Sequence, residues 1–143
     1  MTIVLDQLVD AVNGHDLEAM ARLFHEEYRS EQPVHPGRSF VGRAQLLANW
    51  EAMFAGIPDL SAEIRRSAQA GATAWSEWHW SGTRSDGQPF EARGVTLFEI
   101  GDGQIVAGTL YMEDVDRQGS GIEQAVEALS GRTPRPAQSP PQA

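Results

Sequence analysis

The sequence predicts an α+β domain in which helices cover the concave face of a curved antiparallel sheet. Two patterns along the chain lead to this fold class. Apolar residues recur with helical spacing up to about residue 56, whereas residues 60–115 alternate between polar and apolar side chains as strands do. Short turn sequences separate the predicted strands, which favours antiparallel hairpins. Helices followed by a run of strands are typical of α+β domains.

Three amphipathic helices are predicted in the first part of the chain. In the first, apolar residues fall at i, i+3, i+4 and i+7 counted from Leu5, and we expect Gly14 to end the helix in the left-handed conformation. Asp16 is then well placed to cap a second helix that reaches Phe24. Residues 42–56 have the apolar face of a third helix. These helices are too short to bury themselves, so we expect them to pack on a sheet.

Strands dominate the second half of the chain. A short extended segment is predicted at residues 28–34. Four longer strands follow, separated by turns that contain glycine: residues 60–70, 72–84, 89–100 and 104–115.

A last helix is predicted at residues 121–130, and it closes a single domain at residues 1–131. Residues 132–143 contain four of the eight prolines and no large apolar side chain. This composition is typical of an extended tail that does not join a core.

Composition excludes several classes of function. The formal charge of −9 disfavours nucleic-acid binding, and the absence of cysteine excludes disulfides and thiolate zinc sites. No apolar run is long enough to span a membrane, and the first residues do not resemble a secretory signal. We therefore expect a cytoplasmic protein with no membrane or nucleic-acid partner. We predict neither a metal site nor a cofactor.

Strand alternation predicts which side chains face the helices. Trp78 and Trp80 share one face of their strand, whereas Glu77 and His79 share the other. Because buried charges are costly unless they are paired, the tryptophan face is expected to lie inward. A plain packed core and a ligand cavity both fit this pattern, and flat aromatic walls beside glycines favour a cavity. The predicted pocket consists of Met20, Phe24, Trp50, Phe54, Trp78, Trp80, Thr96, Phe98, Leu110 and Met112.

Several segments together resemble the SnoaL-like polyketide cyclases of the nuclear transport factor 2-like superfamily. They are VNGHDLEAMARLF (12–24), FVGR (40–43), FAGIPDL (54–60), WSGT (80–83), RGVTLF (93–98) and DGQIV (102–106). The order and spacing of these segments carry the resemblance, which covers residues 5–130. It implies a cone-shaped α+β barrel with an apolar cavity, and a homodimer that pairs through the outer sheet face.

The resemblance also implies where related enzymes keep their catalytic groups. Ketosteroid isomerase uses a tyrosine, an aspartate base and a protonated aspartic acid; the similar positions here are Leu8, Gln32 and Thr96. Limonene epoxide hydrolase uses an arginine and two aspartates, and the similar positions here are Trp78, Trp80 and Leu110. Leu110 also stands where polyketide cyclases carry an acid. The residues of all three chemistries are therefore replaced.

Four polar residues are weak catalytic candidates. Gln32 and Thr96 are expected to orient a ligand, and His35 and Asp114 are the candidates for moving a proton. Each has a plain alternative as a loop, core or surface residue. Glu77 and His79 have the spacing of an acid–base pair, but an outward polar sheet face that meets a dimer partner is the favoured interpretation.

Two functions stay open: a cyclase-like or isomerase-like enzyme acting on an apolar polycyclic or polyketide-like molecule, and a non-catalytic ligand-binding or dimeric scaffold module.

Overall fold

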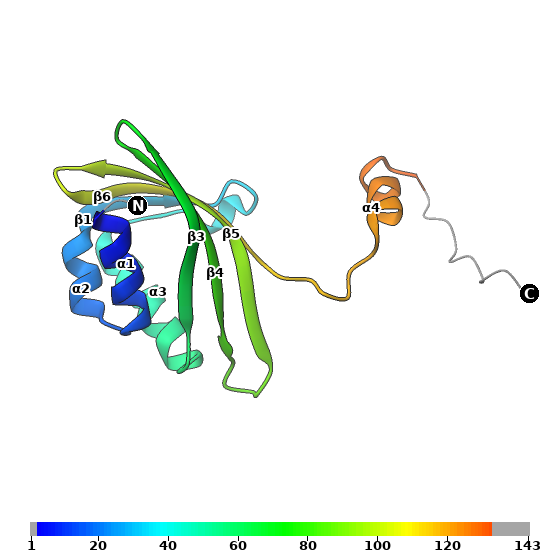
Figure 1. The fold of residues 1–143 in the computed structure, drawn as a ribbon, viewed down its shortest axis with the longest axis horizontal. Helices are drawn as coiled ribbons and strands as arrows, with labels where there is room; N and C mark the ends of the chain where they lie inside the picture. The colour runs from blue at the N-terminus through cyan, green and yellow to red at the C-terminus, as the bar shows by residue number, and fades with distance from the viewer. Residues whose placement is uncertain (1–2, 133–143) are drawn as a thin grey trace, which may run out of the picture.

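The computed structural model describes residues 3–132. Three helices lie against one face of a strongly curved sheet, and a fourth helix stands apart from it (Figure 1). The helices are α1 (Ile3–Asn13), α2 (Leu17–Leu23), α3 (Arg43–Gly56) and α4 (Ile122–Leu129), with a short 3₁₀ turn, η1, at Pro36–Arg38. The strands are β1 (Phe24–Glu31), β2 (Phe40–Val41), β3 (Ser61–Ala70), β4 (Thr73–Thr83), β5 (Pro89–Gly101) and β6 (Gln104–Asp114). The α+β class is confirmed.

The sheet is mixed, which corrects the expectation of a purely antiparallel one. Its strand order is β2-β1-β6-β5-β4-β3, and β3 to β6 form the predicted antiparallel hairpins. Strand β1, however, pairs with β6 in parallel. These two strands are far apart in the chain, so no hairpin forces them to run in opposite directions.

The corner between α1 and α2 differs from its prediction in one residue. His15, and not Gly14, adopts the left-handed conformation, with a φ of 50°. Its ring compensates for this backbone: Nε2 donates a hydrogen bond to the carbonyl of Leu60 over 2.9 Å, and the ring stacks on Phe54 with centroids 4.3 Å apart. Asp16 caps α2 as predicted, because its carboxylate accepts from the backbone N–H of Ala19.

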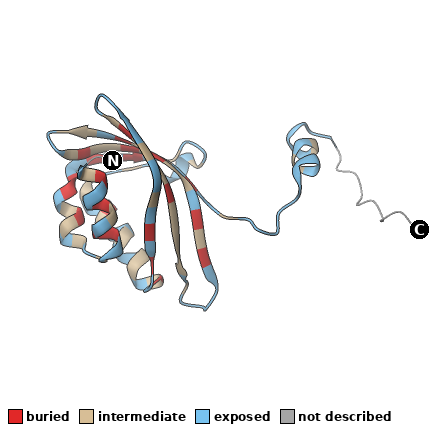
Figure 2. Ribbon diagram, viewed as in Figure 1, coloured by how far each residue is buried: buried red, intermediate tan, exposed pale blue. Residues whose placement is uncertain are grey.

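The core lies between the concave face of the sheet and helices α1 to α3 (Figure 2). Along β4, the alternate residues Ala74, Ser76 and Trp78 are buried and their neighbours are only partly buried. The strand face that was predicted to lie inward is therefore the buried one. The helices bury Leu5, Leu8, Val12 and Met20 against it.

Helix α4 forms where it was predicted but lies away from the sheet (Figure 1). None of its residues is buried, and its apolar residues Ile122, Val126 and Leu129 are 77%, 52% and 88% exposed. That the domain extends to residue 131 stays a prediction. Apart from Arg132, the predicted tail lies outside the described residues. Within residues 3–132, no helix has the length and apolar character needed to cross a membrane.

Candidate functional site

A cavity of about 190 Å³ lies between the sheet and the helices. Strands β1, β2, β4, β5 and β6 and helices α1 and α3 contribute to its wall. Of the residues predicted for the pocket, those that line this cavity are Phe24, Trp50, Trp78, Trp80, Thr96, Phe98 and Leu110. The remaining lining residues are Leu8, Val12, Tyr28, Ser30, Gln32, Phe40, Leu46, Asn49 and Met53.

Three residues predicted for the pocket do not line the cavity. Met20 is fully buried in the closed core beneath α2, and Met112 is buried where β6 faces Gly94 of β5. Phe54 lies near the end of α3 and stacks on His15 instead. Strand parity and helical spacing give the direction of a side chain, but they do not say whether neighbouring atoms already fill the space in front of it.

Thr96 belongs to a buried network with Ser76 and Trp78. Its hydroxyl lies 2.8 Å from that of Ser76, and the indole Nε1 of Trp78 donates to both oxygens, over 3.0 Å to Thr96 and 2.8 Å to Ser76. All three residues are buried. The polar partner that a buried hydroxyl requires is thus supplied by the protein itself. This network fixes the indole of Trp78 in the cavity wall.

Trp80 has a different environment from Trp78. Its ring meets Trp50 edge-to-face, with centroids 5.4 Å apart and an interplanar angle of 72°, and lies 6.4 Å from Trp78. Its Nε1 atom is buried, and no described residue accepts a hydrogen bond from it. Of these two neighbouring indoles on β4, the N–H of Trp78 is thus satisfied by the protein and the N–H of Trp80 is not.

Tyr28 and Ser30 are cavity residues that the sequence analysis did not identify. Tyr28 is 1% exposed, and burial raises the pKa of its phenol above the ordinary 10.0, although a hydrogen bond with Ser30 opposes this shift. The phenol is therefore neutral at physiological pH. Its hydroxyl packs over Gly108, where a Cβ atom would collide with it. The signal that pointed to these residues was alternation: 28, 30 and 32 share one face of an extended segment.

The other polar candidates are dispersed. Gln32 does line the cavity, and its Oε1 accepts a hydrogen bond from Arg38 over 3.0 Å. His35 and Asp114 are not among the residues that line it, and a role for either in proton transfer stays a prediction. The ring of His35 contacts the Glu113 carboxylate, and Asp114 is an exposed partner of Arg84 at 3.6 Å. Both lie where the chain faces solvent.

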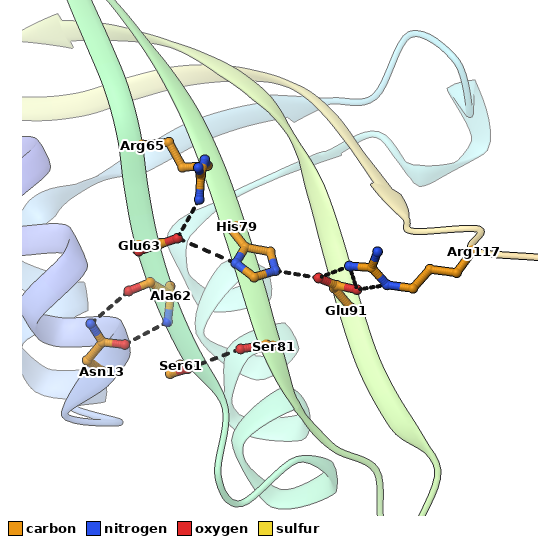
Figure 3. Close-up of polar contacts among 9 residues, drawn as sticks. All are labelled: Asn13, Ser61, Ala62, Glu63, Arg65, His79, Ser81, Glu91 and Arg117. Carbon is orange, nitrogen blue, oxygen red and sulfur yellow. Dashed lines mark hydrogen bonds and ion pairs between the residues drawn. The ribbon is translucent and has the colours of Figure 1, made fainter.

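Glu77 and His79 lie on the outer face of the sheet and do not contact each other. Glu77 pairs with Arg66 at 3.2 Å. His79 lies between two carboxylates, with Nε2 2.7 Å from Glu91 and Nδ1 3.5 Å from Glu63 (Figure 3).

Arg117 completes this cluster on the outer face. Its guanidinium donates to both carboxylate oxygens of Glu91. The His79 hydrogen bond, followed by the contacts with Arg117, lowers the pKa of Glu91 below its ordinary 4.5. Within residues 3–132, no group of three or more histidine or carboxylate side chains has the arrangement of a metal site.

A wider groove follows the free edge of β3. It measures about 830 Å³, is open to solvent and is lined mainly by polar groups, among them Asn13, Asp59 and Ser81. At its base the Asn13 amide pairs with the backbone of Ala62, donating over 2.9 Å and accepting over 2.7 Å (Figure 3). The apolar cavity is the better small-molecule site, because it removes a ligand from water on most sides.

The family model described as a SnoaL-like domain matches residues 5–108. The chain belongs to the SnoaL-like domain family. No protein with a curated description matches it.

Solved structures agree with the SnoaL-like assignment. Wild-type IdmH from Streptomyces antibioticus, provisionally identified as a polyketide cyclase, has a TM-score of 0.68 and 24% identity, over 77% of this chain and 89% of its own. A provisionally identified ketosteroid isomerase from Kribbella flavida has a TM-score of 0.65 and 25% identity, over 92% and 88% of the two chains. A provisionally identified SnoaL-like polyketide cyclase from Jannaschia has a TM-score of 0.67 and 19% identity, over 91% of each.

The SnoaL-like cavity of this chain has an uncharged lining. The positions at which the resemblance implied catalytic groups in related enzymes do line the cavity, and they carry Leu8, Gln32, Trp78, Trp80, Thr96 and Leu110. Among the described residues that line it, none is an aspartate, glutamate, histidine, lysine or arginine. The one titratable side chain is Tyr28, which is neutral. The cavity can bind, orient and donate hydrogen bonds, but its described side chains offer no strong general base.

Proposed function

We propose that this SnoaL-like protein binds a small, uncharged, ring-bearing metabolite in the cavity. The observation that carries the proposal is the lining itself, in which aromatic rings such as Trp50, Trp80 and Phe98 surround a space with no ionised group. Apolar walls with a few fixed polar groups are typical of small-molecule sites. A charged ligand would lose its hydration without gaining an opposite charge there.

The volume suits a ligand of one or two rings. A protein cavity of about 150 Å³ is known to hold benzene, and this cavity measures about 190 Å³. A bicyclic molecule such as indane is therefore close to the largest ligand that this volume accommodates. The polycyclic ligand expected from the sequence is larger than this space, so the proposal is narrowed to a smaller ring system.

A cyclase-like activity is the second candidate function. The family and its structural relatives that are provisionally identified as polyketide cyclases support it. In this chain such a reaction would depend on holding a reactive chain in a folded shape, with neutral donors such as Tyr28 near its carbonyl oxygens. Because the described lining contains no strong base, ligand binding is the function that the geometry supports best.

A cavity-filling variant tests the proposed binding. Leu110→Trp places a large ring on the cavity wall, whereas Tyr111→Trp places the same residue on the opposite face of β6, where Tyr111 is 42% exposed. Calorimetric titration with indane should show binding to the wild type and to Tyr111→Trp, and at least tenfold weaker binding to Leu110→Trp. Circular dichroism checks that both variants fold, since overpacking costs about 1–3 kcal/mol. Equal affinities in all three proteins would contradict the proposal.

The protein is further proposed to form a homodimer through the outer sheet face. That face presents Tyr111, 42% exposed, and Trp75, over which the Arg66 guanidinium lies at 5.6 Å. Aromatic and arginine side chains together are typical of protein interfaces. The pairing expected from the family resemblance uses the same face.

A further inference from the structure

We infer that the ligand presents a hydrogen-bond acceptor, such as a ketone, lactone or ether oxygen, to the indole Nε1 of Trp80. This inference rests on the proposed function, because it assumes that the cavity is a ligand site. It goes further by assigning one atom of the protein to one kind of ligand group. It therefore specifies an acceptor-bearing ring compound and excludes a plain hydrocarbon as the natural ligand.

Two neighbouring indoles of the cavity wall differ in their hydrogen bonds. Trp78 donates its Nε1 hydrogen to the Ser76 and Thr96 hydroxyls. Trp80 is buried at the same atom, and no described residue accepts from it. Buried polar groups in native proteins almost always have a partner, because a donor removed from water and left unpaired is costly. The missing acceptor is therefore expected from outside the protein chain, and Trp80 borders the cavity.

Two side-chain amides in the cavity wall, Gln32 and Asn49, carry acceptor oxygens. The side-chain oxygen of Gln32 accepts from Arg38, and that of Asn49 accepts from the Gln45 amide over 2.7 Å. Both amide oxygens are thus engaged by neighbouring side chains. A ligand that brings an acceptor complements this wall better than one that brings a donor.

The hydroxyls of Ser76 and Thr96 lie beside the Trp78 indole. Of the two hydroxyl hydrogens on Ser76 and Thr96, one is used between them at 2.8 Å. The other has no acceptor among the described residues; when Ser76 donates, this free hydrogen belongs to Thr96, which lines the cavity. The cavity therefore has a surplus of donors on the β4–β5 side, and a neutral carbonyl or ether oxygen suits this side. A carboxylate would also accept, but no cationic side chain among the described lining residues would balance its charge.

Two other partners for the Trp80 N–H compete with a ligand. The ring of Trp50 stands edge-to-face with Trp80, and an N–H can point at an aromatic face. A water molecule in the cavity could also accept the bond. When the N–H stays bonded to the Trp50 ring, or to a water molecule that the ligand does not displace, a ligand oxygen gains nothing from Trp80, and both alternatives predict an unchanged ratio in Trp80→Phe.

The test compares indane with 1-indanone, which share a ring skeleton and differ by one ketone oxygen. The quantity measured is the ratio of their two dissociation constants in the wild type and in Trp80→Phe. Trp80→Phe removes the N–H and enlarges the cavity, but the enlargement affects both ligands and largely cancels in the ratio. We expect the ratio to shift against 1-indanone by about tenfold in Trp80→Phe, the order of effect of one buried hydrogen bond.

The matched control is Trp50→Phe, which removes another indole from the same wall. There the ratio should stay within about twofold of the wild-type ratio. An unchanged ratio in Trp80→Phe, or an equal shift in both variants, would overturn the assignment of Trp80 while leaving the proposed binding function intact. If neither compound binds the wild type, the proposed function itself fails.

A spectroscopic measurement covers the case in which Trp80→Phe does not fold. In ¹⁵N-labelled wild-type protein, 1-indanone should move the indole N–H proton signal of Trp80 downfield, as a new hydrogen bond does, and indane should not. Equal shifts with both compounds would contradict the inference.

Discussion

Trp78 and Trp80 show how two identical residues on one strand face acquire different roles. Alternation along β4 places both rings toward the helices, and this direction follows from the sequence. The hydrogen bonds of Trp78 depend on Ser76 and on Thr96 of the neighbouring strand. The register of β4 against β5, which pairs Ser76 with Thr96, creates that contact. Register depends on the whole hairpin, so strand parity alone could not distinguish the two indoles.

Glu91 gives a pH-dependent prediction at the residue scale. The His79 hydrogen bond and then Arg117 lower its pKa in the folded protein below the ordinary 4.5. A lowered pKa means that the ionised carboxylate favours the folded state above pH 4.5 and that this contribution is lost as the pH falls through the folded-state pKa. Glu91→Gln should therefore lower the melting temperature at pH 7, and the difference from wild type should fade below about pH 4.

Thermal unfolding monitored between pH 3 and pH 8 provides the check. Glu77→Gln is the control on the same sheet face, because its carboxylate faces the largely exposed guanidinium of Arg66, and surface pairs contribute little. A Glu91→Gln effect that is constant over this pH range would contradict the explanation.

At the scale of elements, β1 explains most of what the sequence analysis missed. The predicted extended segment began at residue 28, whereas the strand begins at Phe24 and changes its register against β6 between Phe24 and Arg29. The irregularity breaks the alternation before residue 28: Phe24 is buried and Glu26 is exposed, whereas from Tyr28 onward alternate residues are buried. The parallel pairing with β6 also brings Gly108 beneath Tyr28, and no local pattern in the sequence encodes that contact.

The free edge of β3 gives a prediction at the same scale. Asn13 at the end of α1 pairs its amide with both backbone groups of Ala62, as a neighbouring strand would. Ala62 is only 7% exposed, so Asn13→Ala leaves its backbone N–H and carbonyl without partners. We expect this variant to lower the free energy of unfolding, measured in urea, by about 1–3 kcal/mol. Asn49→Ala, which removes an exposed amide, should change stability by about 0.5 kcal/mol or less. Similar small effects for both variants would show that this contact does not hold α1 on the sheet.

At the scale of the whole molecule, the order of elements and the buried sheet face were predictable because hydrophobic period and turn residues encode them. The position of α4 was not. Its apolar residues have helical spacing, but spacing does not identify the surface that a helix covers, and in the structure Ile122 and Leu129 are exposed. The size of the cavity could likewise not be predicted from the sequence, because it depends on how side chains from α1, α3 and five strands fill one space.

The proposed homodimer is tested on the intact protein. Sedimentation equilibrium at micromolar concentration should give about twice the chain mass of 15.6 kDa. Tyr111→Glu, which adds a carboxylate to a face that already holds Glu63 and Glu91, should shift the protein toward monomer without unfolding it. A wild-type mass of one chain would contradict the proposal.

The central claim is that the space between sheet and helices is a ligand site, and the four tryptophans allow it to be tested in one experiment. Trp50, Trp78 and Trp80 line the cavity, whereas Trp75 lies on the other face of β4. Titration of ¹⁵N-labelled protein with 1-indanone should move the indole signals of the three cavity tryptophans and leave that of Trp75 in place. Shifts confined to Trp75, or no shift at any tryptophan up to the solubility limit of the ligand, would contradict the account.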